Sequence, residues 1–161
     1  MTAKLAGAAL IVAGAVWWCA ARRRRQRQRL TLAQALAQAL SAMETGIRWQ
    51  RRPMPQLLAQ LAQRPVCGTY FDAVREMLQS DMPLQIAWNR TFSRIPDAET
   101  AEVLRRMELG GDETRLLTQL EDARQALTTL AARWAREDAQ DRRVAGALAL
   151  SAAGLLVILL I

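Results

Sequence analysis

Two apolar stretches, one near each end of the chain, dominate its pattern of hydrophobic and polar residues. Residues 5–21 and 144–161 contain no charged side chain. As helices that rise 1.5 Å per residue they would measure roughly 26 and 27 Å, close to the roughly 30 Å hydrocarbon core of a bilayer. We therefore predict one transmembrane helix within residues 1–21 and a second over residues 144–161.

The chain between these stretches has the pattern of a helical bundle. Apolar residues recur every three or four positions, and no strand-like alternation is sustained. Prolines, glycines and capping residues divide the pattern into helices. One continues from the first span to about Gln50, and the others cover residues 55–63, 69–79, 83–95, 97–109 and 112 onward. The predicted fold is all-α, with a cytoplasmic bundle of about six helices over residues 30–143 flanked by N- and C-terminal transmembrane helices.

The helical spacing also predicts which side chains form the bundle core. These include Leu36, Met43, Ile47, Phe71, Trp88, Leu120, Leu127 and Trp134. The last three belong to a seam of alternating four- and three-residue steps on the final helix, the spacing of a heptad repeat. Such a seam could make the chain a homo-oligomer or could pack within the domain. Because the first and last helices both leave the membrane, we expect their seams to pack antiparallel, which favours the second interpretation.

Arginines next to the apolar stretches predict the orientation of the chain. Arg22, Arg23, Arg24 and Arg25 begin a basic run over residues 22–29, and Arg142 with Arg143 precede the second stretch. Positive residues near a span hold their loop in the cytoplasm. Trp17 and Trp18 lie where aromatic rings prefer the membrane interface. We expect both termini outside, the bundle in the cytoplasm, and the protein in the bacterial inner membrane.

Two other interpretations of the N-terminus carry less support. A cleaved signal peptide has its positive charges before the apolar segment, whereas here most of them follow it. Cys19 suggests a lipid attachment site, but the bulky Trp17 and Trp18 occupy positions where such a signal needs small residues.

The net charge of +7 and the sequence pI near 11.1 suggest a nucleic-acid partner until the charges are located. Lys4 and the six arginines of residues 22–29 account for the whole excess. Residues 30–143 contain fifteen arginines and fifteen acidic residues, so the predicted bundle is neutral. The basic excess lies beside the membrane, where anionic lipids attract it. We therefore expect a membrane partner and no nucleic acid.

The composition argues against an enzyme or a metal protein. The chain has no histidine, which removes the commonest general base and the commonest metal ligand. Its two cysteines fall in a predicted span and in the loop, so we expect no disulfide. The sequence Gly110 to Glu113 matches a cyclic dinucleotide synthase signature, but lacks the surrounding strands, and it fits a helix end followed by a capping Asp112. We predict no cofactor and no catalytic site.

Several short motifs resemble the stage III sporulation protein AB family, whose members have a loop domain similar to that of type II secretion platform proteins. The family pattern of a hydrophobic residue, Glu, Ile, an aromatic residue and Pro has counterparts here. Phe71, an Ala-Trp pair and a Leu-Gly turn match further positions. Two departures are the pair Arg105 and Arg106, where the family usually has Phe-Gly, and a leucine-rich start of the last helix in place of glutamine. The matching residues are Met43, Glu44, Ile47, Trp49, Pro53, Phe71, Ala87, Trp88, Leu109 and Gly110.

The resemblance implies a structural platform in the mother-cell membrane around the forespore. It would belong to a secretion-like channel needed around engulfment for spore formation, and its loop would dock a cytoplasmic ATPase. Arg48, Trp49, Arg51 and Arg52 form a candidate docking edge. Trp49 also fits a core position at a helix end, which the sequence slightly favours. The alternatives are a platform of another type II secretion or pilus-like system and, more remotely, a membrane-tethered enzyme.

Overall fold

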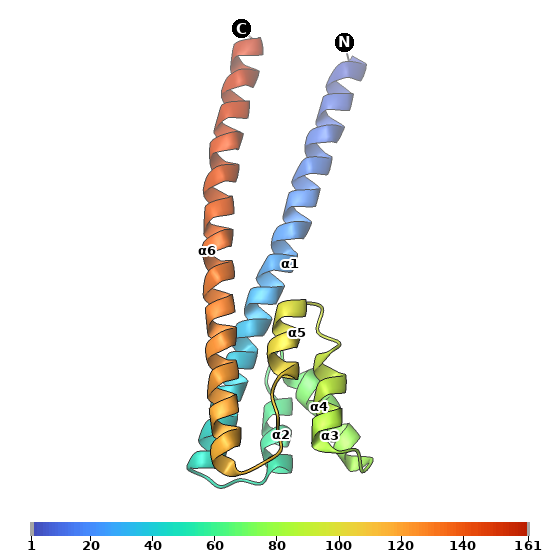
Figure 1. The fold of residues 1–161 in the computed structure, drawn as a ribbon. Helices are drawn as coiled ribbons and strands as arrows, with labels where there is room; N and C mark the ends of the chain where they lie inside the picture. The colour runs from blue at the N-terminus through green and yellow to red at the C-terminus, as the bar shows by residue number, and fades with distance from the viewer. Residues whose placement is uncertain (1, 161) are drawn as a thin grey trace. The chain divides into compact units, whose positions relative to one another are not determined.

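The computed structural model describes the backbone of residues 2–160 and the side chains of residue 14 and residues 17–146. Across this part of the chain the regular secondary structure consists of α-helices joined by loops (Figure 1). In chain order the helices are α1 (Thr2–Arg48), α2 (Met54–Ala62), α3 (Gly68–Gln79), α4 (Leu84–Phe92), α5 (Ala98–Arg105) and α6 (Glu113–Leu160). The all-α prediction is therefore confirmed.

The chain divides into two compact units. One comprises Arg29–Ala132, and the other comprises Met1–Gln28 together with Arg133–Ile161. The long helices α1 and α6 each contribute residues to both units. Residues 133–143, which we assigned to the bundle, belong to the unit that also contains the apolar ends.

Among the side chains that the structure describes, no helix offers a stretch both long and apolar enough to traverse a bilayer. Most residues of the predicted spans, 5–21 and 144–161, have side chains outside that description. Both spans stay predictions.

An aromatic cluster forms the centre of the unit Arg29–Ala132. Phe71, Trp88 and Phe92 are fully buried, and the ring centroids of Trp88 and Phe92 lie 4.3 Å apart. Phe71 meets Phe92 edge to face at 5.7 Å, a geometry that aromatic rings prefer. The indole Nε1 of Trp88 donates a hydrogen bond to the Leu104 carbonyl at 2.9 Å. Its one polar group is thereby satisfied, and α4 is joined to α5.

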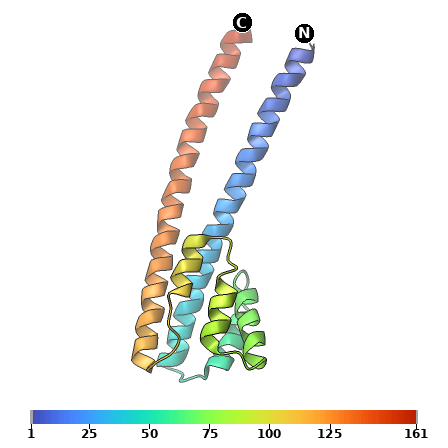
Figure 2. The same cartoon turned by 45° about the vertical axis from the view of Figure 1, so that its right-hand side comes forward.

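The two long helices supply the remaining walls of this core. Leu36 and Met43 on α1, and Leu120 and Leu127 on α6, are fully buried in the same cluster, with Ile47 packed against it. Within this unit the two helices run antiparallel (Figures 1 and 2). The buried seam positions of α6 therefore pack inside the unit. Trp134 is also buried, 6% exposed, on the part of α6 that belongs to the other unit.

Most helix boundaries follow local signals. Pro53 and Pro83 precede α2 and α4 as their N-cap residues, and the Asp97 side chain caps α5. The Asp112 carboxylate accepts a hydrogen bond from the Arg115 amide at 3.0 Å, so it caps α6 as predicted. The expected end of α5 at the glycines was wrong, because α5 ends at Arg105 and residues 106–112 form a loop.

A side chain from another helix explains the early end of α5. Gln85 on α4 donates from Nε2 to the Met107 carbonyl at 2.8 Å. Its Oε1 accepts from the Leu109 amide at 2.7 Å. One amide group therefore satisfies a backbone acceptor and a backbone donor of the loop, which lets residues 106–112 leave the helix.

Candidate functional site

The chain turns sharply where α1 ends and exposes a tryptophan there. The Arg52 amide donates to the Gly46 carbonyl at 3.1 Å, and Arg51 adopts a positive φ of 46°. Leu57 of α2 packs closely against Gly46, where a Cβ would lie 2.3 Å from Cδ2 of Leu57. We call Arg48, Trp49, Arg51 and Arg52 the Trp49 corner.

The Trp49 side chain is 78% exposed. The interpretation of Trp49 as a core residue is therefore wrong. Ile47 fills the hydrophobic side of the last turn of α1 and packs against the core. Trp49, two positions further along, therefore points away from the core. An exposed indole beside arginines is typical of a protein-binding surface.

The arginines of the Trp49 corner differ in their partners. Arg48 pairs with Glu44 at 3.5 Å, and Arg52 donates to the Gln60 side-chain oxygen at 3.1 Å. Neither Arg51 nor Arg52 takes part in an ion pair recorded for the described residues, and both are exposed. The corner therefore presents positive charge next to an apolar ring.

Glu44 forms ion pairs with arginines of two helices, α1 and α6. Its side chain is only 17% exposed, and besides Arg48 it faces Arg124 of α6 at 3.9 Å. The carboxylate therefore joins the end of α1 to α6 beneath the Trp49 corner.

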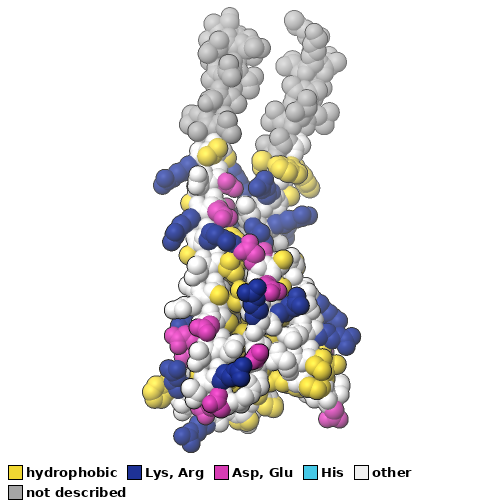
Figure 3. Space-filling model, viewed as in Figure 1, with side chains coloured by type: hydrophobic (Ala, Val, Ile, Leu, Met, Phe, Trp, Pro, Cys, Tyr) yellow, Lys and Arg dark blue, Asp and Glu magenta, His cyan; other side chains and the backbone are white. Residues whose placement is uncertain are grey.

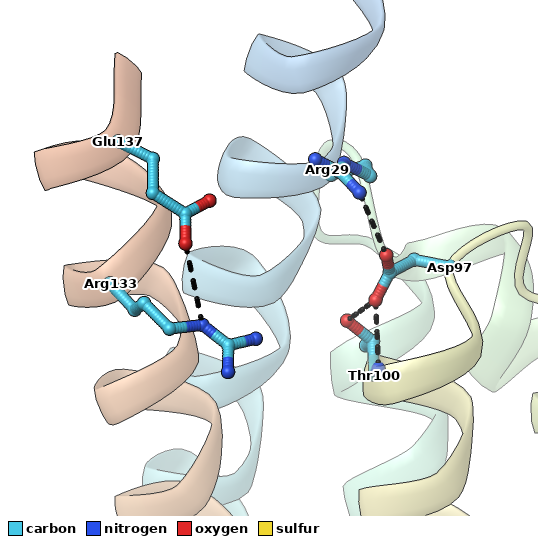
Figure 4. Close-up of polar contacts among 5 residues, drawn as sticks. All are labelled: Arg29, Asp97, Thr100, Arg133 and Glu137. Atoms are coloured by element: carbon cyan, nitrogen blue, oxygen red, sulfur yellow. Dashed lines mark hydrogen bonds and ion pairs between the residues drawn. The ribbon is translucent and has the colours of Figure 1, made fainter. Parts of the chain in front are cut away.

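Sequence reasoning missed a partly buried junction between α1 and Asp97, the N-cap residue of α5 (Figure 4). The Asp97 carboxylate, 8% exposed, accepts hydrogen bonds from the amide of Thr100 at 2.9 Å and from its hydroxyl at 2.8 Å. Arg29 approaches the other oxygen at 3.5 Å. The capping pattern signals Asp97, but nothing local signals that Arg29, 68 positions away, meets it.

The fold changes the acidity of two side chains of α3 and its N-cap, Cys67 and Tyr70. Burial raises the pKa of the Cys67 thiol, and the neighbouring Arg64 opposes this rise in pKa more weakly. Burial likewise raises the pKa of Tyr70. The thiol is fully buried and contacts the Ala35 carbonyl at 3.7 Å, so Cys67 is a packing residue and not an activated nucleophile.

An open groove of about 610 Å³ lies between α5 and α6. Its polar lining is already engaged, since Glu102 pairs with Arg105 and Arg106. This is a surface for contact and lacks the convergent polar groups of a reaction site. The groove is lined by Ala98, Glu99, Glu102, Val103, Arg106, Ala126, Thr129 and Leu130.

The residues predicted for the membrane interface lie on exposed helix surface. Arg22, Arg23, Arg24, Arg25, Arg142 and Arg143 are all exposed. Trp17 and Trp18 are 79% and 64% exposed. In Figure 3 arginine side chains project from the long helices close to the grey atoms. Their position at a membrane surface stays a prediction.

Within the described residues no group of three His, Cys, Asp or Glu side chains converges to hold a metal ion. The free cysteines are Cys19, which is exposed, and the buried Cys67. Across this part of the chain the polar side chains make caps, ion pairs and loop contacts.

The chain matches a family model described as stage III sporulation protein AB over residues 4–161. No curated protein sequence and no solved structure matches it. The match covers nearly the whole chain and confirms the resemblance drawn from the short motifs. Met43 and Phe71, two of those motif residues, are fully buried, whereas Trp49 is exposed.

Proposed function

The chain belongs to the stage III sporulation protein AB family, and from this premise we propose that it is a structural membrane platform of a secretion-like channel between mother cell and forespore. Family membership gives the chain a role in stage III of sporulation. The platform would be anchored in the mother-cell membrane through residues 5–21 and 144–161, with the unit Arg29–Ala132 in the cytoplasm.

We further propose that the Trp49 corner docks a cytoplasmic ATPase of the same complex. The observation that supports this is the exposure of Trp49, 78%, next to arginines without a recorded ion pair. Tryptophan and arginine are the residue types that most often dominate binding energy at protein interfaces. An acidic, partly apolar surface on the ATPase would complement the corner.

Capture of the ATPase by the full-length protein tests the docking. The variant Trp49→Ala with Arg51→Glu removes the apolar ring and reverses one charge, and spares the pair between Arg48 and Glu44. We expect capture to fall at least about tenfold, the scale of one hot-spot loss. The matched control is Ile86→Ala, which truncates another exposed apolar side chain, 54% exposed, on α4.

Circular dichroism should show the same helix content and melting temperature for all three proteins. Equal capture by the wild type and the corner variant would contradict docking at this surface. Capture lost equally in the Ile86 control would also contradict it.

The broader role is tested by deleting the coding sequence and following spore development by microscopy. Development should stop during or after engulfment and should resume when the wild-type chain is supplied. Normal spores from the deletion strain would reject the sporulation role itself, whereas a block that the corner variant rescues would reject the docking alone.

A further inference from the structure

Four consecutive arginines encircle α1 just after two exposed tryptophans. Successive helical residues point about 100° apart, so Arg22, Arg23, Arg24 and Arg25 project in four directions within roughly 5 Å of helix length. All four side chains are exposed. We call Trp17, Trp18 and Arg22–Arg25 the arginine collar.

The charge of the arginine collar is not balanced by acidic residues. No aspartate or glutamate precedes Glu44, which lies 19 positions beyond Arg25 on the same helix. None of the ion pairs recorded for the described residues includes Arg22–Arg25. The Arg22 guanidinium lies 5.8 Å from the centre of the Trp18 ring, within the range of a cation–π contact. Four positive charges therefore remain available to a ligand.

The corresponding part of α6 is different. Residues 133–143 contain four arginines but also three acidic residues. Arg133 pairs with Glu137 at 3.8 Å (Figure 4), and Arg142 pairs with Asp138. This segment is nearly neutral, so attraction for an anionic ligand is concentrated on α1.

We propose that the arginine collar binds the headgroups of anionic phospholipids and gives the protein its preference for them over neutral lipids. The proposal rests on the membrane anchoring proposed above and assigns selectivity for anionic over neutral lipids to these residues of α1. A ring of charges around a helix suits ligands that surround it in a plane. A folded protein or a nucleic-acid groove would contact one side only. Each guanidinium can donate two parallel hydrogen bonds to a phosphate group, and indole rings favour the same interface.

Native mass spectrometry of the full-length protein tests the proposal. The protein is purified in neutral detergent and mixed with equal amounts of phosphatidylglycerol and phosphatidylcholine. The wild type should retain phosphatidylglycerol preferentially. Changing Arg22–Arg25 together to glutamine should lower that preference about tenfold or more, because each basic residue near an anionic surface contributes to binding.

Two control variants make the result specific. Replacing the same four residues with lysine keeps the charge and should keep most of the preference. Changing Arg133→Gln and Arg142→Gln on α6 should lower it by less than about twofold, since both arginines are already paired. A glutamine variant of the collar that retains the wild-type preference would overturn the proposal, as would an equal loss in the α6 variant.

Alkaline extraction of cell membranes separates this proposal from the anchoring on which it rests. A wild-type chain that stays in the membrane but shows no preference for phosphatidylglycerol overturns the collar proposal alone. A chain that washes out of the membrane overturns both proposals. Collar-dependent binding of an RNA oligonucleotide without any lipid preference would assign the arginines to a nucleic acid and would likewise overturn the proposal.

Discussion

At the scale of single residues, the two cysteines have opposite environments. Cys19 is exposed and Cys67 is fully buried. A thiol reacts as its thiolate, and burial raises the pKa of Cys67. In a Cys19→Ala background, a water-soluble disulfide reagent at pH 8 should modify Cys67 slowly in the folded protein and much faster in denaturant, because unfolding exposes the thiol. Equal rates in the folded and the unfolded protein would contradict the burial of this thiol.

The same burial gives the fold a dependence on pH. The pKa of Cys67 is higher in the folded chain than its ordinary value of 9.0, so above about pH 9 the unfolded chain loses this proton first. Unfolding then becomes more favourable as pH rises, and the stabilisation present below pH 9 is lost. Denaturant melts from pH 8 to 10 should show a steeper decline for the wild type than for Cys67→Ser. Parallel curves would contradict the burial effect.

At the scale of elements, the start of α3 depends on the absence of a side chain at Gly68. A Cβ there would lie 2.3 Å from the Ala62 carbonyl oxygen, which is backbone and cannot rotate away. We expect Gly68→Ala to destabilise the protein by about 1–3 kcal/mol, the range for overpacking. Because about 1 kcal/mol changes the melting temperature by roughly 4–8 °C in a domain of this size, calorimetry should detect it.

Gly110→Ala is the matched control, since a Cβ at that position has no neighbour within 4 Å. It should leave the melting temperature within about 3 °C of the wild type, the range of a surface substitution. Equal changes in the two variants would show that the contact between the start of α3 and the end of α2 carries no special constraint.

The helices themselves could be predicted because their signals are local. Pro53, Pro83, Asp97 and Asp112 mark helix starts through backbone geometry or capping, and each needs only a few neighbouring residues. The end of α5 could not be predicted, because Gln85 from another helix holds the loop that follows. The number of helices therefore follows from local sequence signals, whereas the end of α5 follows from the packing of α4 against the loop after it.

The candidate site likewise combines features that local sequence indicates with features that depend on packing. The sequence indicated residues 48–52 as a docking edge, which stays a prediction, but the exposure of Trp49 depends on packing, since Ile47 fills the buried side of the last turn of α1. The ion pair between Arg29 and Asp97 joins residues 68 positions apart. The spacing of hydrophobic residues cannot predict this ion pair, because the pair forms only when α5 packs beside α1.

At the scale of the whole molecule, the proposed topology makes a prediction about access. With the basic run held in the cytoplasm, the unit Arg29–Ala132 should be closed to reagents outside the cell. In a Cys19→Ala background, Ile86→Cys places a thiol at an exposed position on α4. A membrane-impermeant maleimide should label it only after the membrane is permeabilised, whereas a cysteine inserted after Met1 should be labelled in intact cells. The reverse pattern would invert the topology and remove the basis for a cytoplasmic partner.

The four arginines of the collar are consecutive residues of α1, so helix geometry alone sets their arrangement. Turning this segment about its own axis by one residue, about 100°, would bring three of the four side-chain directions to where a neighbour's had been. A lipid headgroup should therefore meet an arginine from almost any side of this segment, whereas a ligand that recognises a single face would require one fixed orientation of the helix.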